Sequence, residues 1–177
     1  SKEVKKENLF TAIKGLKKDG HDYISQAIEK GANYCVVSQR NKKINKNKMI
    51  FYKNTYKFLN KIALIKREKS SAKFIAITGS SGKTTFKTLL GNLLNLFSKT
   101  YFSPRSFNNH YGVPISLSNI ENYHKYGVFE IGMSKKGEIN RLSKIVKPDI
   151  AIITNTAEAH IENFKNIKGI AEAKGEI

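Results

Sequence analysis

The chain has little cysteine, few acidic residues and no long apolar run. Its one cysteine, Cys35, cannot form a disulfide within the chain, and its place in the apolar segment 34–37 indicates a buried thiol on a strand. No apolar run approaches the roughly 20 residues that a membrane-spanning helix requires. The first residues, 1–6, are not followed by the apolar stretch of a signal peptide. These absences exclude a disulfide-rich scaffold and predict a cytoplasmic globular protein with no membrane segment.

Acidic side chains are scarce relative to basic ones. The 177 residues include 32 lysines and arginines against 14 aspartates and glutamates, so the formal net charge is +18. Such an excess can indicate binding to nucleic acid or to anionic substrates. Here the basic residues are mostly lysines spread along the whole chain, and the densest run, 40–48, has no interleaved aromatic side chains for base stacking. We therefore interpret this run as a surface loop and expect no nucleic-acid partner.

The hydrophobic residues, 40% of the chain, form short runs that alternate between strand-like and helix-like spacing. The spacing predicts strands at 9–13, 34–37, 49–52, 74–78, 128–131 and 150–154. It predicts helices at 23–30, 55–69, 84–97 and 138–146. Alternating strands and helices indicate an α/β fold with parallel sheets.

A polar run at 67–71 is the predicted boundary between two domains, 1–70 and 71–177. In open α/β sheets, ligands bind beyond the carboxyl ends of the strands. Three strands of the second domain end in small, polar or acidic residues, at 78–80, 130–132 and 154–156. We expect these three segments to converge on one site.

The segment from Phe74 onward reads as an apolar strand, a turn of small residues and a helix, the context of a phosphate-binding loop. Backbone N–H groups and the helix dipole can hold a polyphosphate, and Lys83 can reach its β and γ phosphates. The hydroxyl of Thr84 suits Mg²⁺. The predicted nucleotide-binding residues are Gly79, Ser80, Ser81, Gly82, Lys83, Thr84 and Thr85. The predicted buried face of the helix comprises Leu89, Leu90, Leu93, Leu94 and Phe97.

The loop is shorter than the usual template, which would place a glycine where this chain has Ile77. A phosphate loop indicates a nucleotide but not a reaction, because kinases, GTPases, helicases and ligases all use one. The discriminating segments lie downstream.

Four segments in order, 78–85, 107–114, 129–139 and 154–162, resemble the Mur ligase family, whose own phosphate loop has this shortened form. Residues 9–37 are similar to the UDP-binding domain of these ligases. The resemblance covers nearly the whole chain. It implies a small N-terminal α/β UDP-binding domain, incomplete at its start, followed by part of a parallel-sheet P-loop ATP-binding domain.

The resemblance also implies a reaction. ATP would phosphorylate a substrate carboxylate, and an amine would then displace phosphate from the acyl phosphate to form an amide. The segment 129–139 is most similar to the members that add D-alanyl-D-alanine to UDP-N-acetylmuramoyl tripeptide. The implied cofactors are ATP and Mg²⁺. The implied catalytic residues are Lys83, Glu130, His160 and Lys174, and the implied metal ligands are Thr84, Glu130, His160 and, if it is carbamylated, Lys174.

Several of these residues have a plainer alternative. Taken alone, Lys174 is a solvated helix lysine. Asn108 and Asn109, implied to contact the phosphate-sugar region of the substrate, also fit an ordinary turn. The implied UDP contacts fit a surface turn equally; they are Lys14, Gly15, Asp19, Gly20 and His21.

Other functions remain open at this point. The chain could belong to a Mur-type ligase that adds diaminopimelate or lysine, or to another nucleotide-binding enzyme. A basic nucleic-acid-binding P-loop ATPase would show steep salt dependence. The resemblance further implies residues beyond Lys174, including a C-terminal domain that receives the amine substrate. We therefore expect a fragment with no ligase turnover by itself.

Overall fold

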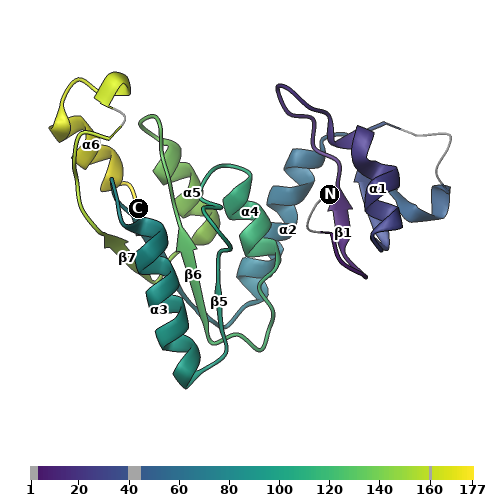
Figure 1. Cartoon of the computed structure of the whole chain (residues 1–177), viewed down its shortest axis with the longest axis horizontal. Coiled ribbons are helices and arrows are strands. Elements are labelled where there is room, and N and C mark those ends of the chain that lie inside the picture. Colours follow the sequence, from purple (N-terminus) through teal and green to yellow (C-terminus); the bar gives the residue numbers. More distant parts are fainter. Residues whose placement is uncertain (1–3, 40–44, 160) are drawn as a thin grey trace. The chain divides into compact units, whose positions relative to one another are not determined.

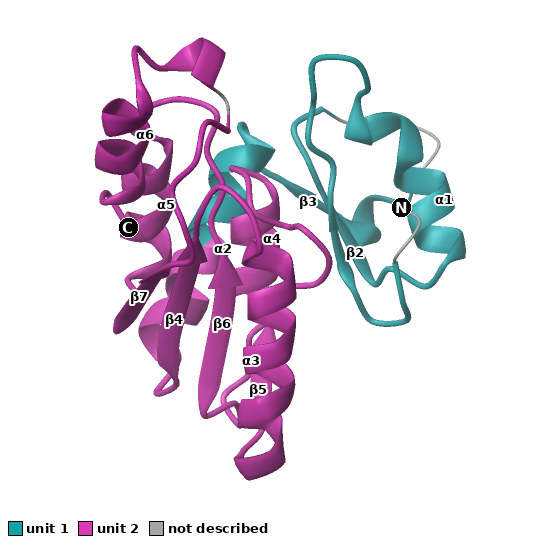
Figure 2. Cartoon of the chain, turned by 60° about the vertical axis from the view of Figure 1, so that its left-hand side comes forward, with its two compact units in different colours: residues 1–61 teal, residues 62–177 magenta. Residues whose placement is uncertain are grey.

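The computed structural model describes residues 4–39, 45–159 and 161–177. By its internal contacts the chain divides into two compact units, residues 1–61 and 62–177, shown in teal and magenta in Figure 2. The division falls inside helix α2 (Thr55–Lys69), whereas the polar run that we expected to separate the domains begins in the last turn of this helix. No helix among the described residues is long and apolar enough to cross a bilayer.

Unit 1 is built on a three-stranded parallel sheet in the order β1-β2-β3. Small side chains fill most of its core, which includes the fully buried Cys35 on β2, as predicted. Of the basic run 40–48, residues 40–44 lie outside the described part of the chain. The elements are β1 (Leu9–Thr11), the 3₁₀ helix η1 (Gly20–Tyr23), α1 (Ile24–Glu29), β2 (Tyr34–Val37), the 3₁₀ helix η2 (Lys46–Lys48), β3 (Met49–Phe51) and the first part of α2.

Unit 2 contains a four-stranded parallel sheet in the order β5-β6-β4-β7. This confirms the predicted parallel α/β architecture. Figure 1 labels β5, β6 and β7, and Figure 2 labels β4 between β6 and β7. The elements are the rest of α2, β4 (Lys73–Thr78), α3 (Lys83–Phe97), β5 (Thr100–Phe102), α4 (Gly112–Ser118), β6 (Tyr126–Glu130), α5 (Glu138–Val146), β7 (Ile150–Ile153), the 3₁₀ helix η3 (Ile161–Asn163) and α6 (Ile167–Lys174).

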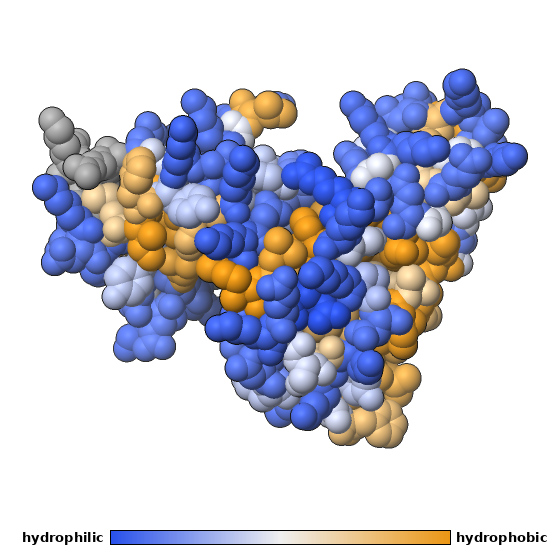
Figure 3. All heavy atoms as spheres, turned by 180° about the vertical axis from the view of Figure 1, so that it is seen from behind, coloured by the Kyte–Doolittle hydropathy of each residue, from blue (hydrophilic) through white to orange (hydrophobic). Residues whose placement is uncertain are grey.

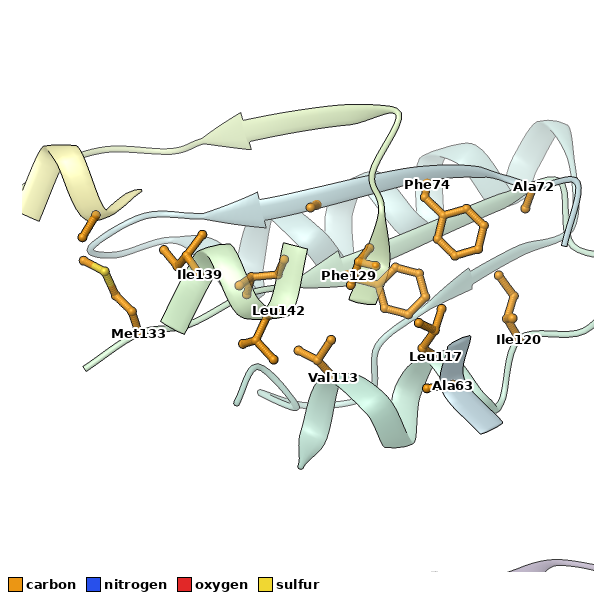
Figure 4. Close-up of a cluster of buried hydrophobic side chains, with 14 of the residues drawn as sticks. Ala63, Ala72, Phe74, Val113, Leu117, Ile120, Phe129, Met133, Ile139 and Leu142 are labelled. Atoms are coloured by element: carbon orange, nitrogen blue, oxygen red, sulfur yellow. The ribbon is translucent and has the colours of Figure 1, made fainter. Parts of the chain in front are cut away.

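The two faces of the unit 2 sheet carry different layers, because successive strand residues point to opposite sides. One face packs against α4, α5 and α6, and its centre is Phe74 on β4 beside Phe129 on β6 (Figure 4). These two rings stack with centroids 5.5 Å apart and an interplanar angle of 3°. On the other face, Ile75 and Ile77 pack against α3.

The structure corrects the predicted buried face of α3. Only Leu90 and Leu94 of the predicted set pack against the sheet. The other three, Leu89, Leu93 and Phe97, are exposed by 65%, 54% and 78%. The helix touches the sheet along one narrow side, and the two apolar stripes of its sequence cannot both face it.

Among the strands and α-helices of the described residues, β5, α4 and α6 have no counterpart in the predicted ranges. Strand β5 has only three residues, so it offers little alternation to detect. Helix α4 contains Gly112 and Pro114, which both count against a helix in a pattern analysis although proline is tolerated in a first turn.

Candidate active site

The carboxyl ends of three strands of unit 2 meet, as their polar endings predicted. Backbone bonds continue each strand pair past its end, from Thr154 N to Thr78 O at 2.9 Å and from Ile131 N to Ile77 O at 2.8 Å. A cavity of about 640 Å³ opens there, lined by residues from the phosphate loop, from the segment after β6 and from the end of α6. Sheet order thus brings residues as far apart in the sequence as Gly79 and Lys174 to one place.

Two glycines shape the loop between β4 and α3. Gly79 has a φ of +150°, and a Cβ there would lie 1.9 Å from the Thr154 hydroxyl oxygen. Gly82, at the N-cap of α3, has a φ of +76°, and no heavy atom lies within 4 Å of its Cβ position beyond the glycine and its chain neighbours. Only glycine suits both backbone angles without strain. The open space at Gly82 lets a ligand approach the backbone closely.

Asn155, at the end of β7, holds this loop in place. Its Oδ1 accepts hydrogen bonds from Ser80 N at 3.1 Å and Ser81 N at 3.0 Å, and its Nδ2 donates to Ser81 Oγ at 2.8 Å. Sequence reasoning placed its segment at the site but gave Asn155 no role. Its position at a strand end beside the phosphate-loop strand is the signal that could have identified it.

Lys83 and the start of α3 provide positive charge at the loop. The Lys83 ammonium lies over the loop and donates to Gly79 O at 2.5 Å and to Ser80 O at 3.3 Å. The N–H groups of the first helical turn, which includes Thr84 and Thr85, have no acceptor within the helix. Together with the helix dipole they form an anion-binding arrangement at the predicted position.

Glu130 at the end of β6 is a buried carboxylate beside the phosphate loop, and only 1% of it is exposed. Its Oε2 accepts from the Thr84 hydroxyl at 2.7 Å, and its Oε1 accepts from Asn108 Nδ2 at 2.7 Å. The Thr84 and Glu130 oxygens are adjacent hard donors of the type that Mg²⁺ prefers. The residues present therefore fit the implied ion.

Two implied metal ligands remain, His160 and Lys174, and the structure describes only Lys174. His160 lies outside the described residues. Within the described residues, no group of three or more histidine, cysteine, aspartate or glutamate side chains could hold a metal. Among the described residues, the groups available to such an ion are those of Thr84, Glu130 and the end of α6.

Lys174, at the end of α6, lines the same cavity and is only 3% exposed. Burial and, to a lesser extent, the nearby charge of Lys83 lower the pKa of Lys174. The plain alternative of a solvated helix lysine is therefore wrong. A buried amine with a lowered pKa is neutral more often than an exposed one, and the neutral form is the one that reacts with CO₂.

A second buried lysine, Lys87, was not identified from the sequence, where it reads as an ordinary helix lysine. It is 1% exposed, donates to Arg105 O, and lies with its Nζ 3.8 Å from Glu130 Oε2. Burial lowers the pKa of Lys87, and the charge of Glu130 opposes this shift. Its spacing of four residues from Lys83, which places both lysines on one side of α3, is the available signal.

Asn108 and Asn109 both line the cavity but have different contacts. Asn108 faces Glu130, as described above. Asn109 Oδ1 accepts from Tyr111 N at 3.0 Å and Gly112 N at 2.9 Å, so its oxygen fixes the turn into α4. The ordinary-turn alternative thus describes the oxygen of Asn109 and does not describe Asn108.

The five residues implied to contact UDP form a turn of unit 1 after β1. Asp19 Oδ1 accepts from His21 N at 2.9 Å and lies 2.6 Å from His21 Nδ1, while His21 Nε2 accepts from Ser38 N at 3.0 Å. The hydrogen bonds from the His21 backbone and then its ring lower the pKa of Asp19. Gly15 N donates to Lys18 O at 2.9 Å. Lys14 pairs with Asp19 as an isolated β-bridge. A Cβ at Gly20 would lie 2.5 Å from Ile13 N.

A phosphate loop and the buried Lys174 at one cavity, with the buried Glu130 hydrogen-bonded to Thr84, define a nucleotide-phosphate site on a parallel sheet. The chain belongs to the Mur ligase family. The family's middle-domain profile, "Mur ligase middle domain", matches residues 77–177, and the profile "Mur ligase family, catalytic domain" matches residues 1–67.

Individual relatives give a closer comparison. The chain is 48% identical over 177 residues to the UDP-N-acetylmuramoyl-tripeptide--D-alanyl-D-alanine ligase of Rickettsia prowazekii, covering 100% of this chain and 39% of the relative. The Haemophilus influenzae protein of the same name is 39% identical over 174 residues, covering 96% of this chain and 38% of the relative. The chain thus spans about two fifths of the length of these relatives.

Solved structures agree with the sequence relatives. A crystal structure of MurF from Acinetobacter baumannii superposes with a TM-score of 0.85 at 34% identity, covering 99% of this chain and 38% of that one. The structure of MurF ligase from Thermotoga maritima in complex with ADP has a TM-score of 0.80 at 35% identity, covering 99% of this chain and 41% of that one.

Proposed function

We propose that this chain provides the ATP-phosphate site and part of the acceptor site of a ligase that adds D-alanyl-D-alanine to UDP-N-acetylmuramoyl tripeptide. The observation that carries the proposal is that the phosphate loop with Lys83 lines a cavity, while Thr84 beside Lys83 is hydrogen-bonded to the buried Glu130. The names of these relatives support the two substrates. Because ATP and UDP-linked precursors are cytoplasmic metabolites, the reaction belongs in the cytoplasm.

The first proposed step brings two anions together. The substrate carboxylate attacks the γ-phosphorus of ATP, the bond to the β-phosphate oxygen breaks, and ADP leaves. Lys83 and the first-turn N–H groups of α3 offset the repulsion and stabilise the charge on the transferring phosphoryl group. In the second step the amine of D-alanyl-D-alanine attacks the acyl carbon, phosphate leaves with its electron pair, and the proton lost by the amine nitrogen passes to the released phosphate.

Mg²⁺, when bound, would supply further neutralisation of the phosphate charge. Thr84 and Glu130 are the residues that would hold it, with His160 and a carbamylated Lys174 as the further ligands. Carbamylation would convert Lys174 from a cation beside Lys83 into an anionic oxygen donor. Carbon-13 NMR of the chain with labelled bicarbonate tests this, and a carbamate signal absent from Lys174→Ala is the expected result.

Unit 1 would hold the uridine diphosphate part of the substrate. Lys14 and Gly15 are the proposed contacts, while Asp19, Gly20 and His21 fix the shape of the turn that carries them. In unit 2, Asn108 would donate to the phosphate-sugar region after releasing Glu130. These assignments separate residues that reach the ligand from residues that build the turn.

Calorimetric titration tests the proposal on the chain itself. The chain is titrated with Mg²⁺ and the non-hydrolysable analogue AMP-PNP, and separately with UDP-N-acetylmuramoyl tripeptide. Lys83→Ala should weaken AMP-PNP binding more than 10-fold, the loss expected from removing a charge-assisted phosphate contact. Lys144→Ala, which removes an exposed lysine in the last turn of α5, is the matched control and should bind as the wild type does.

Two outcomes would contradict the proposal. Equal AMP-PNP binding by wild type and Lys83→Ala would show that the phosphate loop does not bind the nucleotide phosphates. Strong binding of a short DNA duplex at low salt, without binding of the UDP compound, would favour a nucleic-acid-binding ATPase instead.

A further inference from the structure

The loop between β5 and α4, residues 103–111, is fastened to the nucleotide half of the site at several points. Ser106 Oγ lies 3.2 Å from Thr84 Oγ1, and Asn108 Nδ2 donates to Glu130 Oε1 at 2.7 Å. Glu130 N donates to Ser103 Oγ at 3.3 Å, and Gly132 N donates to Asn108 O at 2.8 Å. The loop therefore joins the proposed metal-binding residues to the proposed acceptor contact, Asn108.

Lys87 is the buried charge at the centre of these contacts, and the proposed reaction gives it no task. Its ammonium donates to Arg105 O and lies 3.8 Å from the Glu130 carboxylate. Both charged side chains are only 1% exposed. Burying a charge is costly unless it is paired and hydrogen-bonded. The buried ammonium of Lys87 therefore depends on its contacts with the Arg105 carbonyl and the Glu130 carboxylate.

The backbone at Arg105 provides an independent observation. Its φ is +49°, in the left-handed region that residues other than glycine seldom adopt. Such a conformation persists only where surrounding contacts hold it, and these conformations cluster at functional sites. The carbonyl of this same residue is the one that accepts the hydrogen bond from Lys87.

We propose that Lys87 is a positioning residue that fixes the 103–111 loop and the Glu130 carboxylate relative to each other. The position of the acceptor contact, Asn108, is then tied to the position of the proposed metal-binding residues. Lys87 lies one helical turn after Lys83, and its Nζ contacts the strained loop backbone and Glu130 rather than the phosphate loop. It acts through Glu130 and Asn108 and does not itself touch a substrate in this assignment. Removing it would leave the carboxylate misplaced and the loop free to relax.

The inference rests on the proposed function, because its readout is nucleotide binding. The dissociation constant of AMP-PNP is measured by calorimetry with and without Mg²⁺, and the ratio of the two values gives the gain due to the metal. Lys87→Met should reduce this gain about 10-fold while metal-free AMP-PNP binds as in the wild type, since Lys87 does not contact the phosphate loop. Lys87→Arg, which keeps the charge and the donors, should retain most of the gain. Lys144→Met is the matched control and should keep all of it.

A measurement on the wild type does not depend on whether the variants fold. Amide hydrogen exchange of a peptide spanning residues 103–111 should slow when AMP-PNP is added with Mg²⁺ and should slow less when it is added alone. If AMP-PNP slows the exchange of this peptide equally with and without Mg²⁺, the inference is overturned.

The results separate this inference from the proposed function. If the wild type does not bind AMP-PNP at all, both the proposed function and the inference on Lys87 are contradicted. If the wild type binds AMP-PNP and Mg²⁺ improves the affinity of Lys87→Met as much as that of the wild type or more, only the proposed role of Lys87 is contradicted. A similar loss of affinity with and without Mg²⁺ would also overturn it, because it would show a merely structural effect of the substitution.

Discussion

Both units have a parallel sheet with polar loops beyond the carboxyl ends of its strands, but the side chains of these loops make different contacts in the two units. In unit 1, Asp19, His21 and Ser38 satisfy one another beyond the ends of β1 and β2. In unit 2, Lys83 and Lys174 line a cavity together. The carboxyl end of a parallel sheet is therefore a permissive place for a site. What distinguishes unit 2 is that the half-buried Lys83 and the buried Lys174 both line a cavity.

The cores of the two units differ as well. The core of unit 1 consists mainly of small side chains such as Ala12 and Ala27, whereas unit 2 stacks Phe74 on Phe129. Burial of apolar area stabilises a fold in proportion to the area removed from water, about 25 cal/mol per Å². Unit 2 thus gains more from its core and can hold buried charges that a small core could not offset.

The largest effect expected from this comparison comes from the unit 2 core. Phe129→Ala removes a fully buried ring that stacks on Phe74, and the cavity should lower the free energy of unfolding by about 3–5 kcal/mol. Leu89→Ala is the control, because this side chain is 65% exposed and its removal leaves no cavity. Urea denaturation followed through the amide exchange of β4 and β6 measures both. Equal losses would show that the stack contributes little.

Next in size is the glycine at the phosphate loop. Gly79→Ala would place a Cβ 1.9 Å from the Thr154 hydroxyl at a φ of +150°, so we expect a cost of about 1–3 kcal/mol and loss of AMP-PNP binding. Gly137→Ala has a similarly unfavourable φ, +86°, but no heavy atom within 4 Å outside its own neighbourhood. It should be strained yet bind normally. Calorimetry of both variants checks this, and normal binding by Gly79→Ala would contradict it.

A third variant separates the turn of unit 1 from the site of unit 2. His21→Ala leaves Asp19 and Ser38 without their ring partner and should destabilise unit 1 by about 1–3 kcal/mol. AMP-PNP binding should not change, since the nucleotide contacts lie in unit 2. Exchange of peptides from residues 4–39 reports the first effect and calorimetry the second. A loss of nucleotide affinity would show that the turn has a wider role than its contacts indicate.

The smallest effect is an acid dependence at the start of β4. Phe74 N donates to Asp149 Oδ2 at 2.8 Å, and this bond, followed by Lys73 and Arg67, holds the pKa of Asp149 below its usual value. A lowered pKa means that the contribution is present at neutral pH and is lost as the pH falls below the ordinary aspartate value of about 3.9. The stability difference between wild type and Asp149→Asn should therefore shrink below about pH 4. Thermal unfolding between pH 3 and 7 tests this, and a constant difference would contradict it.

Much of the fold could be predicted because its signals are local. The helices at 55–69 and 138–146 and the strand at 34–37 have the predicted bounds, since spacing and end residues act over a few positions. Convergence of the strand ends followed from the parallel order alone. The buried face of α3 could not be predicted, because periodicity shows apolar stripes but does not show which one meets a sheet.

The candidate site was predictable where a residue type has few uses, as for Lys83 after a glycine loop. Lys87 and Asn155 could not be assigned, because their roles depend on distances across the sheet. A lysine within a helix and an asparagine after a strand are common on surfaces. Only the fold shows that one is buried beside Glu130 and that the other takes two N–H groups of the phosphate loop.

The exposed side of α3 bears on how this chain behaves in solution. Leu89, Leu93, Leu96 and Phe97 are exposed by 65%, 54%, 80% and 78%, and Figure 3 shows apolar surface at the lower tip of unit 2, where α3 ends. A contiguous apolar patch favours association between molecules, while a charge of +18 keeps them apart. Salt screens that repulsion within about 10 Å at 0.1 M. Light scattering should therefore rise with added salt, and dilute, low-salt buffer is the condition in which the chain remains dispersed.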